Sequence, residues 1–480
     1  MRRFALLVLI LWLSRLPGLE TLPLHNDEGL HLTRAVEVWN LHPFWEIRDG
    51  KVINHWAIAL FYPQNAPVFA GRIATIFVSV VGFAAGYALV RRAFGANAAL
   101  LAGALWIACP YLFFFERLAL SDAEAGALVV LALWAGWLLA ERGTMRRTVF
   151  AGLALAALFK FTAAPFAVGV ALVVLLRARY PVGRRVGLLA VAAVVVALCF
   201  AVPVGYLLLG GDDLFSIALA RIGGGSGAQA GIVANLDMLR AQLTGFSLPI
   251  WSMLMLVGLG LLTALRLRDG GVLLLAVGAP LASIIVLGRD AAAPLRRRHP
   301  RFGAGRRGHR HWDRSTGGAG TPAHGDRNRL VPMAAGSAPF ALHAYTEPDQ
   351  LRVPDAIWTQ YFSQHSSGYG LREAVLALPE TTPDIHYRRI ASMTADSCHR
   401  ANYATPPFIM DCTGEPQADL QAALADATSV YVVVESVTGA HFPQDADALD
   451  ADAELIATYH RPTRSGEAEQ PVTVWKLTRR

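Results

Sequence analysis

Charged residues are scarce in this chain. Only 16% of the 480 residues carry a charge, 54% are apolar, and the mean hydropathy is +0.39. An average soluble domain has roughly 25% charged residues, so this composition excludes an ordinary soluble protein. The repeated long apolar runs predict a polytopic membrane protein instead.

Cysteine is rare as well. Four cysteines are too few for a disulfide framework, which excludes a small disulfide-stabilised secreted fold. Cys109 and Cys199 lie in apolar runs, where we expect packing residues. Cys398 and Cys412 lie in the polar C-terminal part, and we predict a disulfide between them if that part faces an oxidising compartment.

Basic residues are unevenly distributed. The chain has three lysines, which are Lys51, Lys160 and Lys476. Segment 289–329 holds eleven arginines and three aspartates, a net charge of +8, whereas the whole chain carries +7. Because one segment makes the protein basic, the high isoelectric point does not indicate a nucleic-acid-binding surface, and no nucleic acid is expected as a partner.

The same segment has an unusual composition. Residues 289–329 are mostly Arg, His, Gly, Ala and Pro, and they hold four of the fourteen histidines. The preference for Arg over Lys elsewhere suggests GC-rich coding DNA, in which an out-of-frame stretch yields these residue types. Our hypothesis is that part of 289–335 is translated out of frame and replaces one or two membrane helices. The alternative is a basic linker, and translation of the gene's other frames distinguishes the two.

Apolar runs predict the membrane topology. A span needs about 20 apolar residues, and a charge at its centre is costly. We expect spans at about 4–19, 67–90, 98–115, 123–140, 148–162, 163–177, 186–209, 246–265 and 271–288. No small-x-small cleavage site follows the first run, so an uncleaved helix is expected there. Arginines cluster in alternate loops, so the positive-inside rule assigns to the outer face residues 20–66, 116–122, 160–165 and 210–245.

The C-terminal part is polar and mixed. Ser429 to Glu435 and Pro471 to Leu477 have the composition of strands, while Gly370 to Leu378 and Gln417 to Ala427 have that of helices. The predicted fold is therefore an all-α polytopic membrane protein with a small C-terminal extracytoplasmic α/β domain. Its expected divisions are 1–288 with about nine spans, the anomalous segment 289–336, and the exterior domain 337–480.

The stretch from His25 to His31 places two adjacent carboxylates in the first outer loop. A carboxylate there faces water and lipid-borne substrate, an arrangement suited to moving a group off a lipid carrier. Asp27 is the candidate general base, and Glu28 either assists it or binds a cation. The alternative for Asp27 is a helix N-cap. A histidine pair six residues apart is not a recognised ligand spacing, so no metal site is assigned, and a divalent cation is the only cofactor considered.

Four more charged residues lie near the outer ends of spans. Asp122 follows the third span, where it would orient the acceptor or help to hold a divalent ion; its alternative is also an N-cap. Arg72, Arg117 and Lys160 are placed to neutralise a phosphate. Each could instead extend its charge to the lipid headgroups, and we expect at least one of the three to meet phosphate.

The order of these motifs resembles that of the GT-C glycosyltransferases. The motifs are Arg15-Leu-Pro17, Asp27-Glu28, Ala70-Gly71-Arg72, Arg91-Arg92-Ala93-Phe94-Gly95 and Arg117-Leu-Ala-Leu-Ser-Asp122. Within that fold, residues 1–288 look most similar to the protein O-mannosyltransferase and aminoarabinose transferase group. Pro354 to Gly370 resemble an exterior segment of bacterial relatives. The chain departs from the pattern at 289–335, where the family continues with membrane helices.

The resemblance implies an integral membrane glycosyltransferase. Its donor would be a sugar on a polyprenyl phosphate, attacked at the anomeric carbon with inversion. The acceptor would be a protein, lipid or glycan, and the site would lie on the outer face of the plasma (bacterial inner) membrane. The phosphate leaving group needs no general acid, so one carboxylate base suffices, whereas glycosidases need two carboxyls.

Two other functions remain open from the sequence. They are a transporter or flippase for lipid-linked sugars and a non-catalytic membrane protein. A transporter is expected to carry ionisable residues near the middle of its spans or to show internal repeats, and the sequence shows neither. The charges lie at the ends of the spans, which favours the enzyme.

Overall fold

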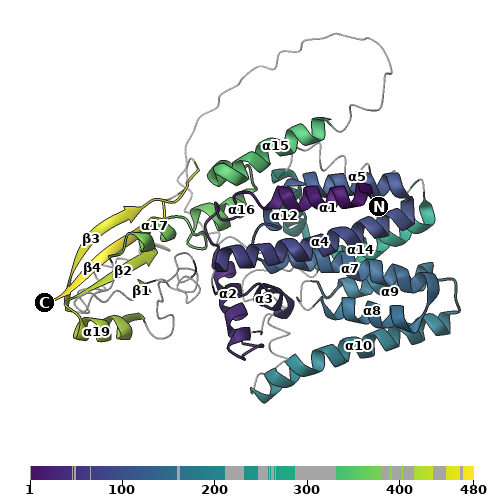
Figure 1. Cartoon of the computed structure of the whole chain (residues 1–480), viewed down its shortest axis with the longest axis horizontal. Coiled ribbons are helices and arrows are strands. Elements are labelled where there is room, and N and C mark those ends of the chain that lie inside the picture. Colours follow the sequence, from purple (N-terminus) through teal and green to yellow (C-terminus); the bar gives the residue numbers. More distant parts are fainter. Residues whose placement is uncertain are drawn as a thin grey trace, which may run out of the picture.

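The computed structural model describes residues 2–45, 47, 50–64, 66–158, 160, 163–210, 232–246, 258, 260, 264, 266–286, 331–379, 389–391, 403, 416–435, 450–464, 467 and 469–480. Figure 1 shows a helical bundle and, beyond one end of it, a small sheet. Cys398, Cys412 and residues 287–330 lie outside the described residues. The predicted disulfide and the frameshift hypothesis therefore stay predictions.

The bundle is built from the apolar runs. Its helices are α1 (Arg2–Arg15), α4 (Pro67–Phe94), α5 (Ala96–Ala108), α6 (Pro110–Phe115), α7 (Ser121–Arg142), α8 (Met145–Ala156), α9 (Phe166–Arg177), α10 (Val182–Leu209), α12 (Ile232–Gly245) and α14 (Leu267–Val286). Among the described residues, α4, α7 and α10 are long and apolar enough to cross a membrane, and α5 and α9 are shorter apolar helices. Most of the span expected at 246–265 lies outside the described residues.

Two expected spans are shorter than predicted. The span at 98–115 is divided into α5 and α6 at Cys109, because Pro110 lacks the N–H needed to continue α5. The span at 148–162 ends as a helix at Ala156, where α8 stops. Both corrections affect the same end of the bundle, where the loops with the candidate site residues lie.

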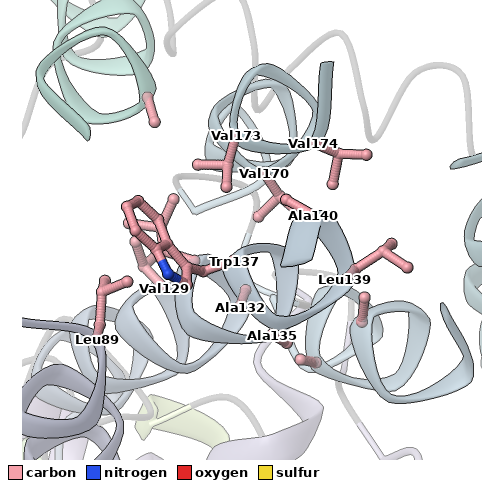
Figure 2. Packing of buried hydrophobic residues seen from close by; sticks show 14 of the residues in the cluster. Leu89, Val129, Ala132, Ala135, Trp137, Leu139, Ala140, Val170, Val173 and Val174 are labelled. Atoms are coloured by element: carbon pink, nitrogen blue, oxygen red, sulfur yellow. The ribbon is translucent and has the colours of Figure 1, made fainter. Parts of the chain in front are cut away.

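Helix α7 lies at the centre of the bundle. Gly82 of α4 lets Ala127 approach so closely that a Cβ at Gly82 would lie 2.5 Å from the Ala127 Cβ, and Gly136 allows a similar approach by Val170 of α9. Figure 2 shows Val170, Val173 and Val174 across from α7, which contributes the buried Trp137. This packing holds α4, α7 and α9 in a defined relation to one another.

The loops alternate between the two ends of the bundle. At one end, Arg92 pairs with Glu141 at 2.9 Å and Arg177 pairs with Asp269 at 3.2 Å. At the other end lie α2 (Asn26–Trp39) and α3 (Val52–Ala59), the two short helices expected in the first outer loop (Figure 1). This is the alternation that the positive-inside rule predicts, and the outward orientation of the second end stays a prediction.

The C-terminal sheet has four strands among the described residues. In the order β1-β2-β4-β3 they are β1 (Arg389–Ala391), β2 (Ser429–Glu435), β4 (Val472–Arg479) and β3 (Ala451–Tyr459), with β1 parallel to β2 and the other pairs antiparallel. Side chains alternate across β2, so Val433 packs against α17 (Leu371–Leu376) and Val432 packs against α19 (Pro416–Asp426). The expected strands and helices are present, which confirms the fold class, and β1 and β3 were not foreseen.

Helix α15 (Val331–Thr346) joins the two parts. Phe340 packs against Phe113, the Ser337 Oγ donates to the Ala108 carbonyl at 2.7 Å, and the Tyr345 hydroxyl donates to the Ser14 carbonyl at 2.6 Å. The expected boundary between residues 336 and 337 therefore falls inside a helix that packs on the bundle. The chain continues through η2 (Pro348–Gln350), α16 (Asp355–Trp358) and η3 (Thr359–Ser363) to α17.

Candidate active site

The start of α2 carries the central carboxylates. Its N-cap is His25, whose Nδ1 accepts a hydrogen bond from the Asp27 N–H at 3.2 Å, while Glu28 Oε2 accepts from the His25 N–H at 2.9 Å. This is a capping box with histidine in the capping position. Asp27 is therefore not the N-cap, contrary to the alternative drawn from the sequence, and its carboxylate does not cap the helix.

Glu28 is buried and engaged on both oxygens. Oε1 accepts from Arg72 Nε at 2.9 Å and from the Ala119 N–H at 2.7 Å, and Oε2 accepts from Arg72 Nη2 at 2.8 Å as well as from His25. Burial would raise the pKa of Glu28, but the Arg72 guanidinium holds it below its usual range. With two bonds on each oxygen, Glu28 keeps no lone pair for a cation.

Arg72 is saturated in the same way. Besides its two bonds to Glu28, it donates at 2.6 to 3.4 Å to the carbonyl oxygens of Leu19, Leu22 and Pro23. A guanidinium has five N–H donors, and all five are used inside the protein. The structure therefore gives Arg72 no donor for a phosphate, unlike the role expected from the sequence.

Arg117 also binds within the protein. It donates to the carbonyl oxygens of Pro17 and Gly18 at 2.6 Å each and to that of Ala344 at 3.1 Å. Its guanidinium stacks on the rings of Phe113 and Tyr345. Arg117 thus ties the turn after α1 to the last turn of α15, whose end carbonyls need such donors.

A different set of cations interacts electrostatically with the candidate base. Lys51 immediately precedes α3, and its Nζ lies 3.4 Å from His31 Nε2. His31 Nδ1 lies 2.8 Å from the Ala119 carbonyl, so Nδ1 carries the proton and Nε2 accepts from Lys51. Lys160 Nζ pairs with Asp122 Oδ1 at 2.5 Å. The structure therefore unites Lys51, Lys160 and Asp122 at one end of the bundle.

Electrostatics tie Asp27 to this group. Burial would raise the pKa of the Asp27 carboxyl, but its electrostatic interactions with His25, Lys51 and Lys160 hold it below its usual range. Burial and the Lys51 charge lower the pKa of His31 to about 3, so His31 is neutral. Asp27 is thus an ionised carboxylate that interacts electrostatically with Lys51 and Lys160.

Lys51 and Lys160 line one cavity, which holds about 270 Å³ of empty space and is open to solvent. Its other lining residues are Gly50, Ile53, Asn54, Ser121, Glu124, Ala125, Leu128, Ala157, Leu158 and Ala163. Asp122 lies at its edge through the bond to Lys160 and is 60% exposed. It is the second residue of α7, whose N-cap is Leu120 without a side-chain bond, so Asp122 does not cap the helix.

Sequence reasoning missed Lys51, Asn54 and Glu124. The rarity of lysine was the one available signal, because two of the three lysines line this cavity. Asn54 and Glu124 carry no such signal, since Asn54 lies in a short, mostly apolar helix and Glu124 lies in the first turn of α7, where acidic residues are common for reasons of the helix dipole. In the part of the chain that the structure describes, no group of three or more His, Cys, Asp or Glu side chains is arranged to hold a metal ion.

The C-terminal part contacts the start of α2. The His25 ring stacks on the Tyr361 ring of η3 with centroids 4.5 Å apart, and the Asn26 N–H donates to the Ser366 carbonyl at 3.0 Å. Gly368 lies so close to Leu24 that a Cβ would meet the Leu24 carbonyl oxygen at 2.6 Å. The segment from Pro354 to Gly370 therefore packs against the residues that immediately precede Asp27.

Comparisons with known proteins agree with this architecture. Residues 52–206, from the start of α3 into α10, match the family described as dolichyl-phosphate-mannose-protein mannosyltransferase. The structure is similar to the crystal structure of ArnT from Cupriavidus metallidurans bound to undecaprenyl phosphate, with a TM-score of 0.51, 14% sequence identity, and coverage of 98% of this chain and 97% of that chain. No curated protein matches the chain significantly. The chain is therefore a membrane protein with the fold of the GT-C glycosyltransferases, and its residues 52–206 carry the sequence pattern of the mannosyltransferase family.

Proposed function

We propose that this protein transfers a sugar from a polyprenyl phosphate to an acceptor at the outer membrane face. The observation that carries the proposal is the electrostatic interaction of the ionised Asp27 with Lys51 and Lys160, two lysines that line a common cavity. The similarity to ArnT, solved with undecaprenyl phosphate, supports a carrier of that chemistry. The acceptor is a protein, lipid or glycan group.

The residues divide the reaction between them. Asp27 takes the proton of an acceptor hydroxyl as its oxygen forms a bond to the anomeric carbon. The bond from that carbon to the phosphate oxygen breaks on the opposite side, so the configuration inverts. Lys51 and Lys160 stabilise the negative charge of the departing phosphate, and Asp122 orients Lys160.

The remaining charged residues position this group. Glu28 and Arg72 join α2 to α4 and to the segment at Ala119, so that α2 presents Asp27 in a fixed direction. Arg117 fixes the neighbouring turn to α15. In this assignment the phosphate-binding role passes from Arg72 and Arg117 to Lys51, and Lys160 keeps it.

We expect Lys51→Ala and Lys160→Ala each to weaken binding of undecaprenyl phosphate. A hydrogen bond to a charged group contributes about 1.5–3 kcal/mol, so affinity should fall roughly 10- to 100-fold. Titration of undecaprenyl phosphate into the purified full-length protein measures this. Lys476→Ala is the matched control, because Lys476 is the third lysine and lies in β4. Wild-type affinity in both cavity variants would place the phosphate site elsewhere.

The pH profile tests the charges around Asp27. A base works in its ionised form, and the pKa of Asp27 is held below its usual value of about 3.9. Transfer to a hydroxyl acceptor should therefore not decline because of Asp27 between pH 7 and 5. Lys51→Gln removes one of the charges that lower this pKa, so the acid limb of the turnover rate at saturating donor should move to higher pH. If the acid limb did not move, Lys51 would not be one of the charges that lower the pKa of Asp27.

A further inference from the structure

We propose that the buried wall of this cavity is the subsite for the donor's sugar, and that Asn54, Ser121 and Glu124 bind its hydroxyl groups. The inference rests on the proposed function, because it assumes that the lysines of the same cavity hold the carrier phosphate. The inference names the residues that contact the sugar, which the proposed phosphate site does not specify.

Two buried polar atoms in this wall have no hydrogen-bond partner among the described residues. Asn54 of α3 is 2% exposed, and its Nδ2 donates to Glu124 Oε2 at 2.9 Å, which leaves Oδ1 with no hydrogen bond among the described residues. Ser121 opens α7 and is 4% exposed, and in the described part of the chain its Oγ has no partner either. Buried polar groups in native proteins are nearly always paired, so two orphans in one cavity indicate a ligand that completes them.

Glu124 adds further acceptors to the same wall. Its Oε1 accepts from the Thr75 hydroxyl at 3.2 Å and its Oε2 accepts from Asn54, one bond on each oxygen. Each carboxylate oxygen has a second lone pair. The wall therefore presents the Asn54 carbonyl, the Glu124 carboxylate and the Ser121 hydroxyl, a set dominated by acceptors.

The two parts of the cavity have opposite chemistry. Lys51 and Lys160 are partly exposed donors, whereas the residues of the wall are buried acceptors. A glycosyl phosphate has the complementary pattern, because its phosphate only accepts and its sugar hydroxyls donate.

The test compares a carrier with and without its sugar. Full-length wild-type protein is titrated with undecaprenyl phosphate and with undecaprenyl phosphates bearing mannose, glucose, galactose or 4-amino-4-deoxyarabinose. The glycosylated carrier that binds best is then used for the variants. Ser121→Ala should weaken its binding roughly 3- to 10-fold, and Asn54→Ala by more, because the second change also takes a hydrogen bond from Glu124. Binding of undecaprenyl phosphate should stay within about twofold, which also shows that the variants fold.

A matched control separates the subsite from burial alone. Ser79→Ala removes another buried hydroxyl without a partner among the described residues, but Ser79 does not line the cavity, so neither carrier should be affected. Equal losses for both carriers in Ser121→Ala and Asn54→Ala, or no loss, would overturn the subsite. The subsite would also be overturned if the wild-type protein bound no glycosylated carrier more tightly than undecaprenyl phosphate. A wild-type protein that does not bind undecaprenyl phosphate, or normal binding of it by both Lys51→Ala and Lys160→Ala, would overturn the proposed function instead.

Discussion

We expect Asp27→Asn to lower sugar transfer to a hydroxyl acceptor by about 10²–10⁴-fold, the usual contribution of a positioned general base. Asparagine keeps the size of the side chain but removes the charge and the basicity. Because His25 and not Asp27 caps α2, the substitution leaves the capping box intact. The loss should appear in turnover, while binding of the polyprenyl phosphate donor is retained.

Glu37→Gln provides the control for this variant. Glu37 lies on the same helix, and its carboxylate bonds locally to Asn40 and His42, so turnover should stay near that of the wild type. Single-turnover kinetics with a hydroxyl acceptor and purified protein measure both variants. Near-normal turnover of Asp27→Asn would remove Asp27 from the mechanism. An acceptor that is already an anion, such as a lipid phosphate, needs no base. If Asp27→Asn lowered turnover only slightly with such an acceptor, and strongly with hydroxyl acceptors, the comparison would identify the class of the acceptor.

The largest effect on stability is expected for Arg72→Met. The change removes the cation from a fully buried pair. It leaves Glu28 with only the backbone N–H donors of His25 and Ala119, and it removes the Arg72 donors of three carbonyl oxygens. Breaking one side of a buried ion pair costs about 3–5 kcal/mol, because the remaining charge stays buried without compensation. Thermal unfolding of the detergent-solubilised protein should show a clearly lower midpoint, with little folded protein recovered.

Arg92→Met is the matched comparison. Arg92 and Glu141 also form an Arg–Glu pair between α4 and α7, at 2.9 Å, but their side chains are 45% and 22% exposed. An exposed pair contributes about 0–1 kcal/mol, so the unfolding midpoint should hardly move. If the two variants lowered the midpoint equally, the Glu28–Arg72 pair would not be the structural link between α2 and α4.

Local patterns predicted the elements well where a single run of residues decides the outcome. The apolar runs that form α4, α7 and α10 were recognised, as were the two short helices around Leu30 and Ile53 and the strand Ser429–Glu435. The strand Ala451–Tyr459 was not, because its burial is mixed and it pairs with β4 only through the hairpin register. A strand of this kind is stabilised by its neighbour more than by its own composition.

The roles of the charged residues, by contrast, could not be predicted from local patterns. Arg72 and Lys160 look alike in the sequence, each a cation near the outer end of an apolar run. The structure separates them, because Arg72 meets a carboxylate 44 positions away and uses every donor, whereas Lys160 lines the cavity. The adjacent Asp27 and Glu28 also diverge, since successive residues of a helix point about 100° apart and only Glu28 faces Arg72.

The sequence by itself determined the membrane class, the positions of the long helices, the alternation of the basic loops and the acidic stretch at Asp27, because these depend on hydrophobicity and charge summed over neighbouring residues. Only the tertiary structure decided which charges are consumed inside the protein and which line the cavity, and it alone brought Lys51, Asn54, Ser121 and Glu124 together. Electrostatic and hydrogen-bond energies depend on separations of a few ångströms and on burial, and neither quantity is a function of distance along the chain.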